Sequence, residues 1–114
     1  MTHFIKIYQQ LKKGNNEKVL VVYPKIYHNR NLPLIPLSGV SNTETIDCNE
    51  NGYYSIYQSD RYGFNNPDTE WDETDIGYFL VGDSYAHGAC VNRPNDIGSV
   101  LRTLSNKSVL NLGQ

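Results

Sequence analysis

The sequence predicts an α/β protein, and three consecutive segments near its carboxyl end support this class. Residues 76–81 form an apolar run without charge, which is typical of a strand buried on both faces of a parallel sheet. Residues 108–112 form a second strand-like run. Between them, apolar side chains recur at the spacing of a helix that lies on a sheet, at Ile97, Val100, Leu101 and Leu104. A strand, a helix and a strand make a βαβ unit, whose two strands are parallel.

The composition describes an ordinary soluble globular chain of one domain at most. Its 114 residues are 39% hydrophobic and 19% charged, with a net charge of -2. Because there is no basic excess, nucleic acid is not an expected partner. No apolar run approaches the roughly 20 residues that span a bilayer, and the first residues lack the apolar core of a signal peptide. We therefore expect no membrane segment and take the cytoplasm as the default compartment.

The amino-terminal extension, residues 1–75, begins with a predicted helix over residues 3–13, where apolar positions fall at helical spacing. Residues 19–23 are rich in β-branched side chains and predict a strand closed by a proline. Residues 29–42 contain two prolines and no steady period, so they predict an extended surface loop.

A β-hairpin is predicted next. Residues 43–47 and 53–57 alternate and are rich in β-branched and aromatic side chains, and Asn51-Gly52 between them suits a tight turn. Much of the chain's tyrosine lies between Tyr8 and Tyr62. These rings could form a surface for stacking on sugars, but strand tyrosines more often cover a core with their hydroxyls in water.

Residues 60–67 are rich in turn formers, and residues 68–75 predict a solvated acidic linker into the strand at 76–81. Five carboxylates stand in these eight linker positions, but their spacing does not match a calcium-binding loop. Cys48 and Cys90 lack a CxxC spacing, so no zinc site is expected. Two buried free thiols are the simpler interpretation, and a disulfide between them stays open.

The strongest candidate site is Gly82-Asp83-Ser84, which follows the apolar strand directly. Open α/β sheets bind ligands at the carboxyl ends of their strands, and Ser84 lies there. A serine nucleophile needs a base and donors for the oxyanion, and the backbone N–H of Ser84 at a helix start can supply one donor. We expect Gly82 to permit a sharp turn and Asp83 to brace it. The competing interpretation of Ser84 is a helix cap.

These residues also carry a family resemblance. Leu80-Val81-Gly82-Asp83-Ser84, with Gly63-Phe64-Asn65 before it and Asn111-Leu112-Gly113 after it, resembles the amino-terminal part of an SGNH (GDSL-type) hydrolase. The resemblance covers residues 60–114. It implies a flavodoxin-like three-layer α/β/α fold, no cofactor, and an esterase or acyltransferase that forms an acyl-enzyme at Ser84. Its substrate would be an acyl ester of a small molecule or a glycan.

The chain departs from the family pattern in the groups that activate the serine. The family's Asp-x-x-His and Gly-x-Asn-Asp are not in this sequence. We therefore expect residues 76–114 to be a truncated first βαβ unit, inactive alone. Gly113 is interpreted as a strand-to-loop turn and not as the family's second-block glycine. His87 shares a face with Ser84 but has poor geometry for a base and no visible acid to orient it, so a partly buried histidine or a pocket contact is expected.

His3 and His28 stand in no motif and are expected to have surface or structural roles. Two readings from other classes stay open. One is a non-catalytic flavodoxin-like or receiver-like module in which Gly82-Asp83-Ser84 only caps a helix, and the other is a carbohydrate-binding module that uses the tyrosine hairpin. The acyl group, the acceptor and the oligomeric state are not predicted.

Overall fold

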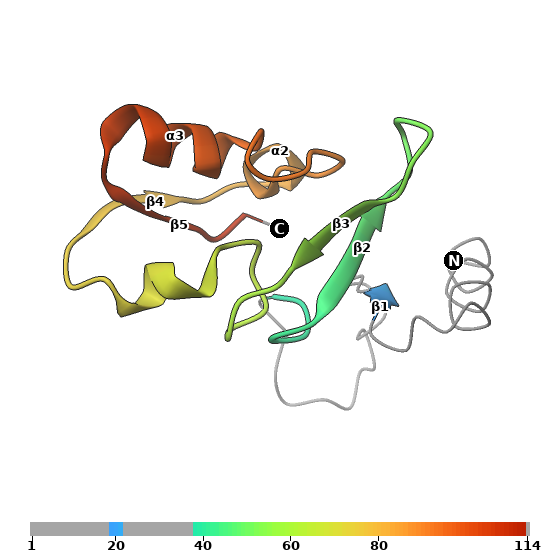
Figure 1. The fold of residues 1–114 in the computed structure, drawn as a ribbon, viewed down its shortest axis with the longest axis horizontal. Helices are drawn as coiled ribbons and strands as arrows, with labels where there is room; N and C mark the ends of the chain where they lie inside the picture. The colour runs from blue at the N-terminus through green and yellow to red at the C-terminus, as the bar shows by residue number, and fades with distance from the viewer. Residues whose placement is uncertain (1–18, 22–37, 114) are drawn as a thin grey trace.

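The computed structural model describes residues 19–21 and 38–113 as a small mixed α/β protein (Figure 1). Its elements in chain order are β1 (Val19–Val21), β2 (Glu44–Cys48), β3 (Ser55–Gln58), η2 (Asp68–Asp72), β4 (Ile76–Leu80), α2 (Ser84–His87), α3 (Ile97–Ser105) and β5 (Ser108–Asn111). The predicted helix at 3–13 lies outside the described residues, as do part of the strand at 19–23 and most of the loop at 29–42. No described helix is long and apolar enough to cross a membrane.

The first sheet has the order β1-β2-β3 and contains the predicted hairpin. β1 runs parallel to β2, and β2 runs antiparallel to β3, with Ile46 opposite Ile56. Gly52 lies in the connecting turn with φ 80°, a backbone conformation that glycine adopts without steric cost. The hairpin prediction is therefore confirmed.

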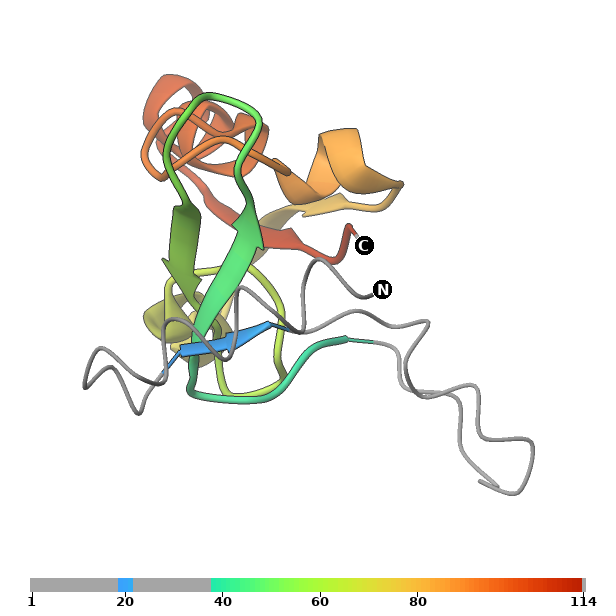
Figure 2. The same ribbon diagram turned by 90° about the vertical axis from the view of Figure 1, so that its right-hand side faces the viewer.

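The second sheet consists of β4 and β5, which are parallel, with Phe79 opposite Leu110. α3 begins after Asp96, whose carboxylate accepts the N–H of Ser99, and ends at Asn106 in the left-handed conformation. α3 packs against β5. The predicted βαβ unit is therefore confirmed. Figure 2 shows the two sheets next to each other, with β5 passing behind the hairpin.

The prediction that the strand at 76–81 is buried on both faces is wrong. The central residues of β4 are exposed, and Phe79 keeps 60% of its surface accessible. Among the described residues β4 pairs only with β5, so one edge and much of one face of the strand have no neighbour. An apolar run indicates a strand that can be buried, but it does not supply the covering layer.

The apolar stripe of α3 also points away from the sheet. Leu104 is 80% exposed, and Ile97 and Val100 are exposed as well. The buried positions of the helix are Gly98 and Ser99. A Cβ at position 98 would stand 3.2 Å from Asp96 Oδ2, which is a tight contact, whereas its distance of 3.6 Å from the Asn111 side chain is an ordinary one.

The described core is mostly polar, and one part of it lies between the 60–72 segment and β5. Asn66 is its centre and is 1% exposed. Its Nδ2 donates to the Asp60 carboxylate at 2.9 Å and to the Asn111 carbonyl at 2.9 Å. Its Oδ1 accepts the Asn111 N–H at 2.8 Å and Arg102 Nη2 at 2.8 Å. The Asn66 side chain thus pairs with both backbone groups of Asn111, as a neighbouring strand would.

Glu70 protects the same edge of β5 nearer to its start. Its Oε2 accepts the Val109 N–H at 3.0 Å and the Ser108 hydroxyl at 2.7 Å, while its Oε1 lies 3.3 Å from Arg102 Nε. Arg102 Nη2 donates to the Val109 carbonyl at 2.7 Å. Side chains therefore satisfy the outer edge of β5, which would otherwise be open to pairing with other chains.

The acidic stretch at 68–75 is accordingly more than a solvated linker. Its first five residues form η2, and Trp71 Nε1 donates to the buried Asp60 carboxylate at 2.7 Å. Residues 68, 69 and 72–75 are exposed as expected. The linker prediction is wrong for Glu70 and Trp71 because both find partners far away in the chain.

The expectation of free thiols is wrong as well, since Cys48 and Cys90 form a disulfide. The end of β2 lies beside the segment after α2, so the two Cα atoms stand 5.3 Å apart, within the range that a disulfide spans. The bond joins the hairpin to the βαβ unit.

Candidate active site

Ser84 lies where the sequence predicts, just beyond the carboxyl end of β4 and at the first residue of α2. The residue is exposed. Asp83 provides the helix cap, since its Oδ1 accepts the Tyr85 N–H at 3.0 Å and its carbonyl accepts the His87 N–H at 3.0 Å. The predicted bracing role of Asp83 is thus observed. Because Asp83 caps the helix, the Ser84 hydroxyl is not needed as the cap.

Gly82 serves a purpose different from the one expected. Its φ is not in the left-handed region, whereas Gly88, which ends α2, has φ 83°. A Cβ on Gly82 would stand 2.9 Å from the Cβ of Ala86. The glycine is therefore required for the close approach of strand end and helix, and the left-handed turn comes four residues after Ser84.

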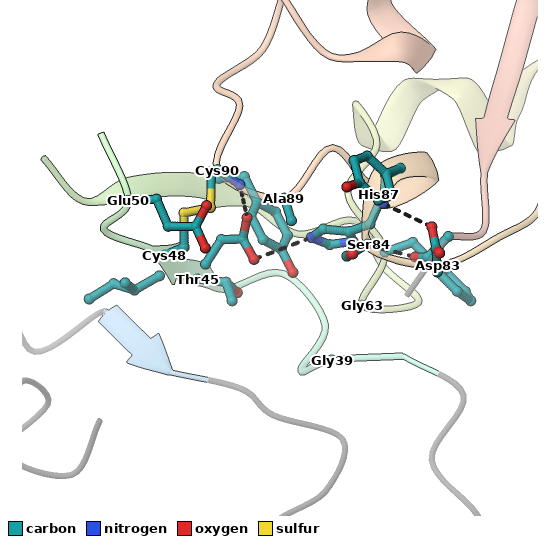
Figure 3. A pocket seen from close by; sticks show the side chains of 16 residues that line it. Gly39, Thr45, Cys48, Glu50, Gly63, Asp83, Ser84, His87, Ala89 and Cys90 are labelled. Atoms are coloured by element: carbon teal, nitrogen blue, oxygen red, sulfur yellow. Dashed lines mark hydrogen bonds and ion pairs between the residues drawn. A yellow bond between two sulfur atoms is a disulfide. The ribbon is translucent and has the colours of Figure 1, made fainter. Parts of the chain in front are cut away.

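A pocket of 750 Å³ opens between the hairpin and α2. Figure 3 shows Ser84 and His87 on one side of it and Thr45, Cys48 and Glu50 on the other. The lining residues come from four parts of the described chain: Gly39; Thr45, Ile46, Asp47, Cys48, Glu50 and Tyr57; Gly63 and Phe64; Asp83, Ser84, Tyr85, His87, Ala89, Cys90 and Gly113. Both halves of the chain, before and after residue 76, therefore build the pocket.

His87 has an acidic neighbour that sequence reasoning missed. Its Nε2 lies 3.8 Å from Asp47 Oδ1 on β2, and its Nδ1 lies 3.3 Å from the Gly113 carbonyl. The ring also meets the edge of Tyr57, with centroids 5.3 Å apart. Both ring nitrogens thus face oxygens other than the Ser84 hydroxyl. The interpretation of His87 as a partly buried pocket contact is confirmed, and the expectation that no acid stands beside it is wrong.

Tyr57 is the most perturbed titrating group of this pocket. Burial of its ring, followed by the nearby Asp47 carboxylate, raises the pKa of Tyr57 to about 12. Both causes disfavour the phenolate, so the hydroxyl stays neutral at physiological pH. The tyrosines of the hairpin region do not share one environment, because Tyr62 packs edge-on against Trp71 with ring centroids 4.6 Å apart.

The two other segments of the resemblance meet at the end of α2. Asn65 Nδ2 donates to the His87 carbonyl at 3.2 Å, and Asn111 Nδ2 donates to the Ala86 carbonyl. At Gly113, directly after β5, a Cβ would come within 2.7 Å of the Ala86 carbonyl carbon, so only glycine fits. The sequence analysis named Asn65 only as part of the family resemblance and interpreted Gly113 as a strand-to-loop turn. It did not predict that both segments hold the helix that begins at Ser84.

The charge of the pocket lining is acidic. Asp47, Glu50 and Asp83 contribute carboxylates, and none of the lining residues that the structure describes is lysine or arginine. Across residues 19–21 and 38–113, no three His, Cys, Asp or Glu side chains gather as metal donors. His3 and His28 lie outside these ranges.

Fold and site together define a small mixed α/β protein that presents an exposed serine at the end of a parallel strand, beside a pocket shared with a hairpin. No family model, curated protein or solved structure matches the chain.

Proposed function

We propose that this chain carries the nucleophile half of an SGNH-type serine hydrolase site, which acts on ester bonds through an acyl-enzyme at Ser84. In this proposal the unit β4-α3-β5 is the start of a flavodoxin-like three-layer sheet. The observation that supports it best is the position of Ser84. The residue is exposed, stands next to a 750 Å³ pocket and follows a parallel strand, while Asp83 takes over the capping role.

The proposed reaction is acyl transfer. The Ser84 Oγ attacks the ester carbonyl carbon, the alcohol leaves, and water or a sugar hydroxyl then takes the acyl group from the serine. The backbone N–H of Ser84, in the first turn of α2, has no acceptor within the helix and is available to the developing oxyanion. Substrates would be acyl esters of small molecules or glycans.

Within residues 19–21 and 38–113, no base is placed for Ser84. The Asp-x-x-His pattern is missing from the sequence, and His87 faces Asp47 and Gly113. A serine hydroxyl without a base is a poor nucleophile at neutral pH. We therefore expect this chain alone to show no significant esterase activity, although Ser84 is positioned to react.

Free imidazole can replace the missing base and makes the proposal testable. The chain is incubated with p-nitrophenyl acetate, with and without imidazole, and acetylation is located by peptide mass spectrometry. We expect acetylation at Ser84 only when imidazole is present, because the small base reaches the exposed hydroxyl from the pocket.

Ser84→Ala and Ser41→Ala are the matched controls, since both serines are exposed and only one lies in the pocket. Ser84→Ala should abolish the imidazole-dependent label, and Ser41→Ala should leave it unchanged. Acetylation spread evenly over exposed serines, or none at Ser84, would contradict the nucleophile assignment. Hydrolysis without imidazole that disappears in Ser84→Ala would contradict the absence of a base.

A further inference from the structure

We infer that the Cys48–Cys90 disulfide regulates the Ser84 pocket, so that a dithiol reductant releases the hairpin from the segment that follows the serine. Only the expected effect of reduction on the reactivity of Ser84 rests on the proposed function. We call residues 88–93 the clasp segment. The structural coupling itself involves the hairpin, α2 and the clasp segment.

The clasp segment is fastened to the hairpin at Cys90, Asn92 and Arg93. Beside the disulfide, the Cys90 N–H donates to Asp47 Oδ2 at 2.7 Å, and Asn51 Nδ2 donates to the Cys90 carbonyl at 3.0 Å. Further along, the Ser55 hydroxyl donates to Asn92 Oδ1 at 2.9 Å, and Arg93 Nη2 donates to the Gln58 carbonyl at 2.8 Å.

Asp47 connects the clasp segment to the end of α2, the helix that begins at Ser84. One of its carboxylate oxygens accepts the Cys90 N–H, and the other lies 3.8 Å from His87 Nε2. Asp47 directly precedes Cys48, so the disulfide fixes the position of the carboxylate between the clasp segment and α2. Loss of the disulfide would therefore affect His87, three residues after Ser84, as well as Cys90.

The disulfide is also placed where a reductant can reach it. Cys48 and Cys90 are only partly buried, and both line the pocket that contains Ser84. A disulfide that solvent can reach through an open pocket can exchange with thiols. Cys90 has φ 63°, a left-handed conformation that a residue with a side chain rarely adopts, and reduction would free it to leave that conformation.

The chemical step is ordinary thiol–disulfide exchange with a dithiol, either a small molecule or a redox protein. One thiolate of the reductant attacks a sulfur of the Cys48–Cys90 bond and forms a mixed disulfide. The second thiol then displaces the protein sulfur, so the reductant leaves as a disulfide. Two electrons and two protons pass to the protein, which now carries two cysteine thiols.

Reduction should change only the hairpin side of the pocket. The carbonyl groups of Ala86 and His87 stay bound to Asn111 and Asn65, and none of these contacts involves the hairpin strands. The sheet of β4 and β5 with α3 keeps its own contacts as well. We expect the hairpin side of the pocket to open while the βαβ unit keeps its structure.

Native-state hydrogen exchange tests this on the full chain, oxidised and after reduction with dithiothreitol. We expect the amides of His87, Ala89 and Cys90 to exchange about tenfold faster after reduction, while those of Val100 and Leu110 keep their rates, because local opening does not require global unfolding. The double variant Cys48→Ser/Cys90→Ser should match the reduced protein, and Asp47→Asn should accelerate Cys90 with the disulfide intact.

Uniform acceleration of all amides would show that the disulfide is only a global staple, and unchanged rates at His87 and Cys90 would show no coupling. Either result overturns the inference. Unfolding of the reduced chain would appear as uniform acceleration and therefore overturns it as well. Imidazole-dependent acetylation of Ser84 gives the functional readout and should slow after reduction. If Ser84 is acetylated in neither state, the proposed function fails, whereas the exchange result still decides the coupling.

Discussion

Asn66 should be one of the most sensitive positions for stability, although it lies in a turn-rich segment. Replacing it with alanine removes four hydrogen bonds and leaves the buried N–H and C=O of Asn111 without partners. A buried polar group that loses its partner costs about 1–3 kcal/mol. Arg102 and Asp60 keep other partners, so the two Asn111 groups dominate and Asn66→Ala should cost about 4 kcal/mol.

That loss is a large part of the roughly 5–15 kcal/mol that stabilises a domain. Urea denaturation followed by circular dichroism measures it. With an m-value of about 2 kcal/mol/M, the midpoint should fall by about 2 M. Asn49→Ala is the matched control, because this asparagine is exposed in the hairpin connection, and its free energy of unfolding should stay within about 0.5 kcal/mol of the parent.

A loss below about 1 kcal/mol for Asn66→Ala would refute the reasoning. It would mean that water satisfies the N–H and C=O groups of Asn111 when the Asn66 amide is removed. The Asn66 side chain would then not be essential at the outer edge of β5. A loss of the same size in Asn49→Ala would equally refute it, because the effect would then not depend on burial.

Three further substitutions test other contacts. The pKa of Tyr57 is raised from 10.0 to about 12, so its contribution to stability is complete below pH 10 and is lost between pH 10 and 12. Tyr57→Phe should reduce that alkaline loss by about 2–3 kcal/mol in pH-dependent urea melts, and an unchanged loss would contradict the burial of the ring. Gly113→Ala should lower the melting temperature by several degrees, since its Cβ meets the backbone of α2, and an unchanged value would contradict the close approach. Glu70→Gln should cost about 1–3 kcal/mol in thermal or urea melts by weakening the bonds to Val109 and Arg102, and a neutral result would place this edge in contact with water.

Local patterns predicted the elements well because the forces that set them are local. The Asn51-Gly52 turn, the run at 76–81 and the helical spacing from Ile97 to Leu104 each depend on residues within a few positions of one another. The parallel pairing of β4 and β5 follows from the crossover through a helix, which returns the chain to the same end of the sheet and needs no knowledge of the rest of the chain.

The polar core could not be predicted in this way. Asn66 and Asn111 stand 45 positions apart, and nothing in either segment indicates the other. One signal was available, since Asp60 accepts the N–H groups of Tyr62 and Phe64 at 2.9 Å, the pattern of an aspartate that organises its own turn. Asp47 gave no such signal, because its contacts with Cys90 and His87 arise only when the hairpin packs against α2.

Periodicity also misjudged which faces are covered. The stripe of α3 at 3.6-residue spacing shows that the helix is amphipathic, but the buried positions of the helix are Gly98 and Ser99. The apolar side chains of that helix and of β4 therefore remain exposed in the described part of the chain. An apolar pattern indicates that a surface can be buried. It does not indicate which other segment covers that surface.

The position of Ser84 depends on both sides of the boundary at residue 76. From the side of β5, Asn111 and Gly113 hold the end of α2, and Asn65 holds the His87 carbonyl from the preceding segment. From the hairpin, the disulfide and Asp47 hold the segment after the helix. The extension is therefore part of the serine site, because residues 76–114 alone would lose half of the pocket lining and the Asn66 and Glu70 side chains that satisfy the outer edge of β5.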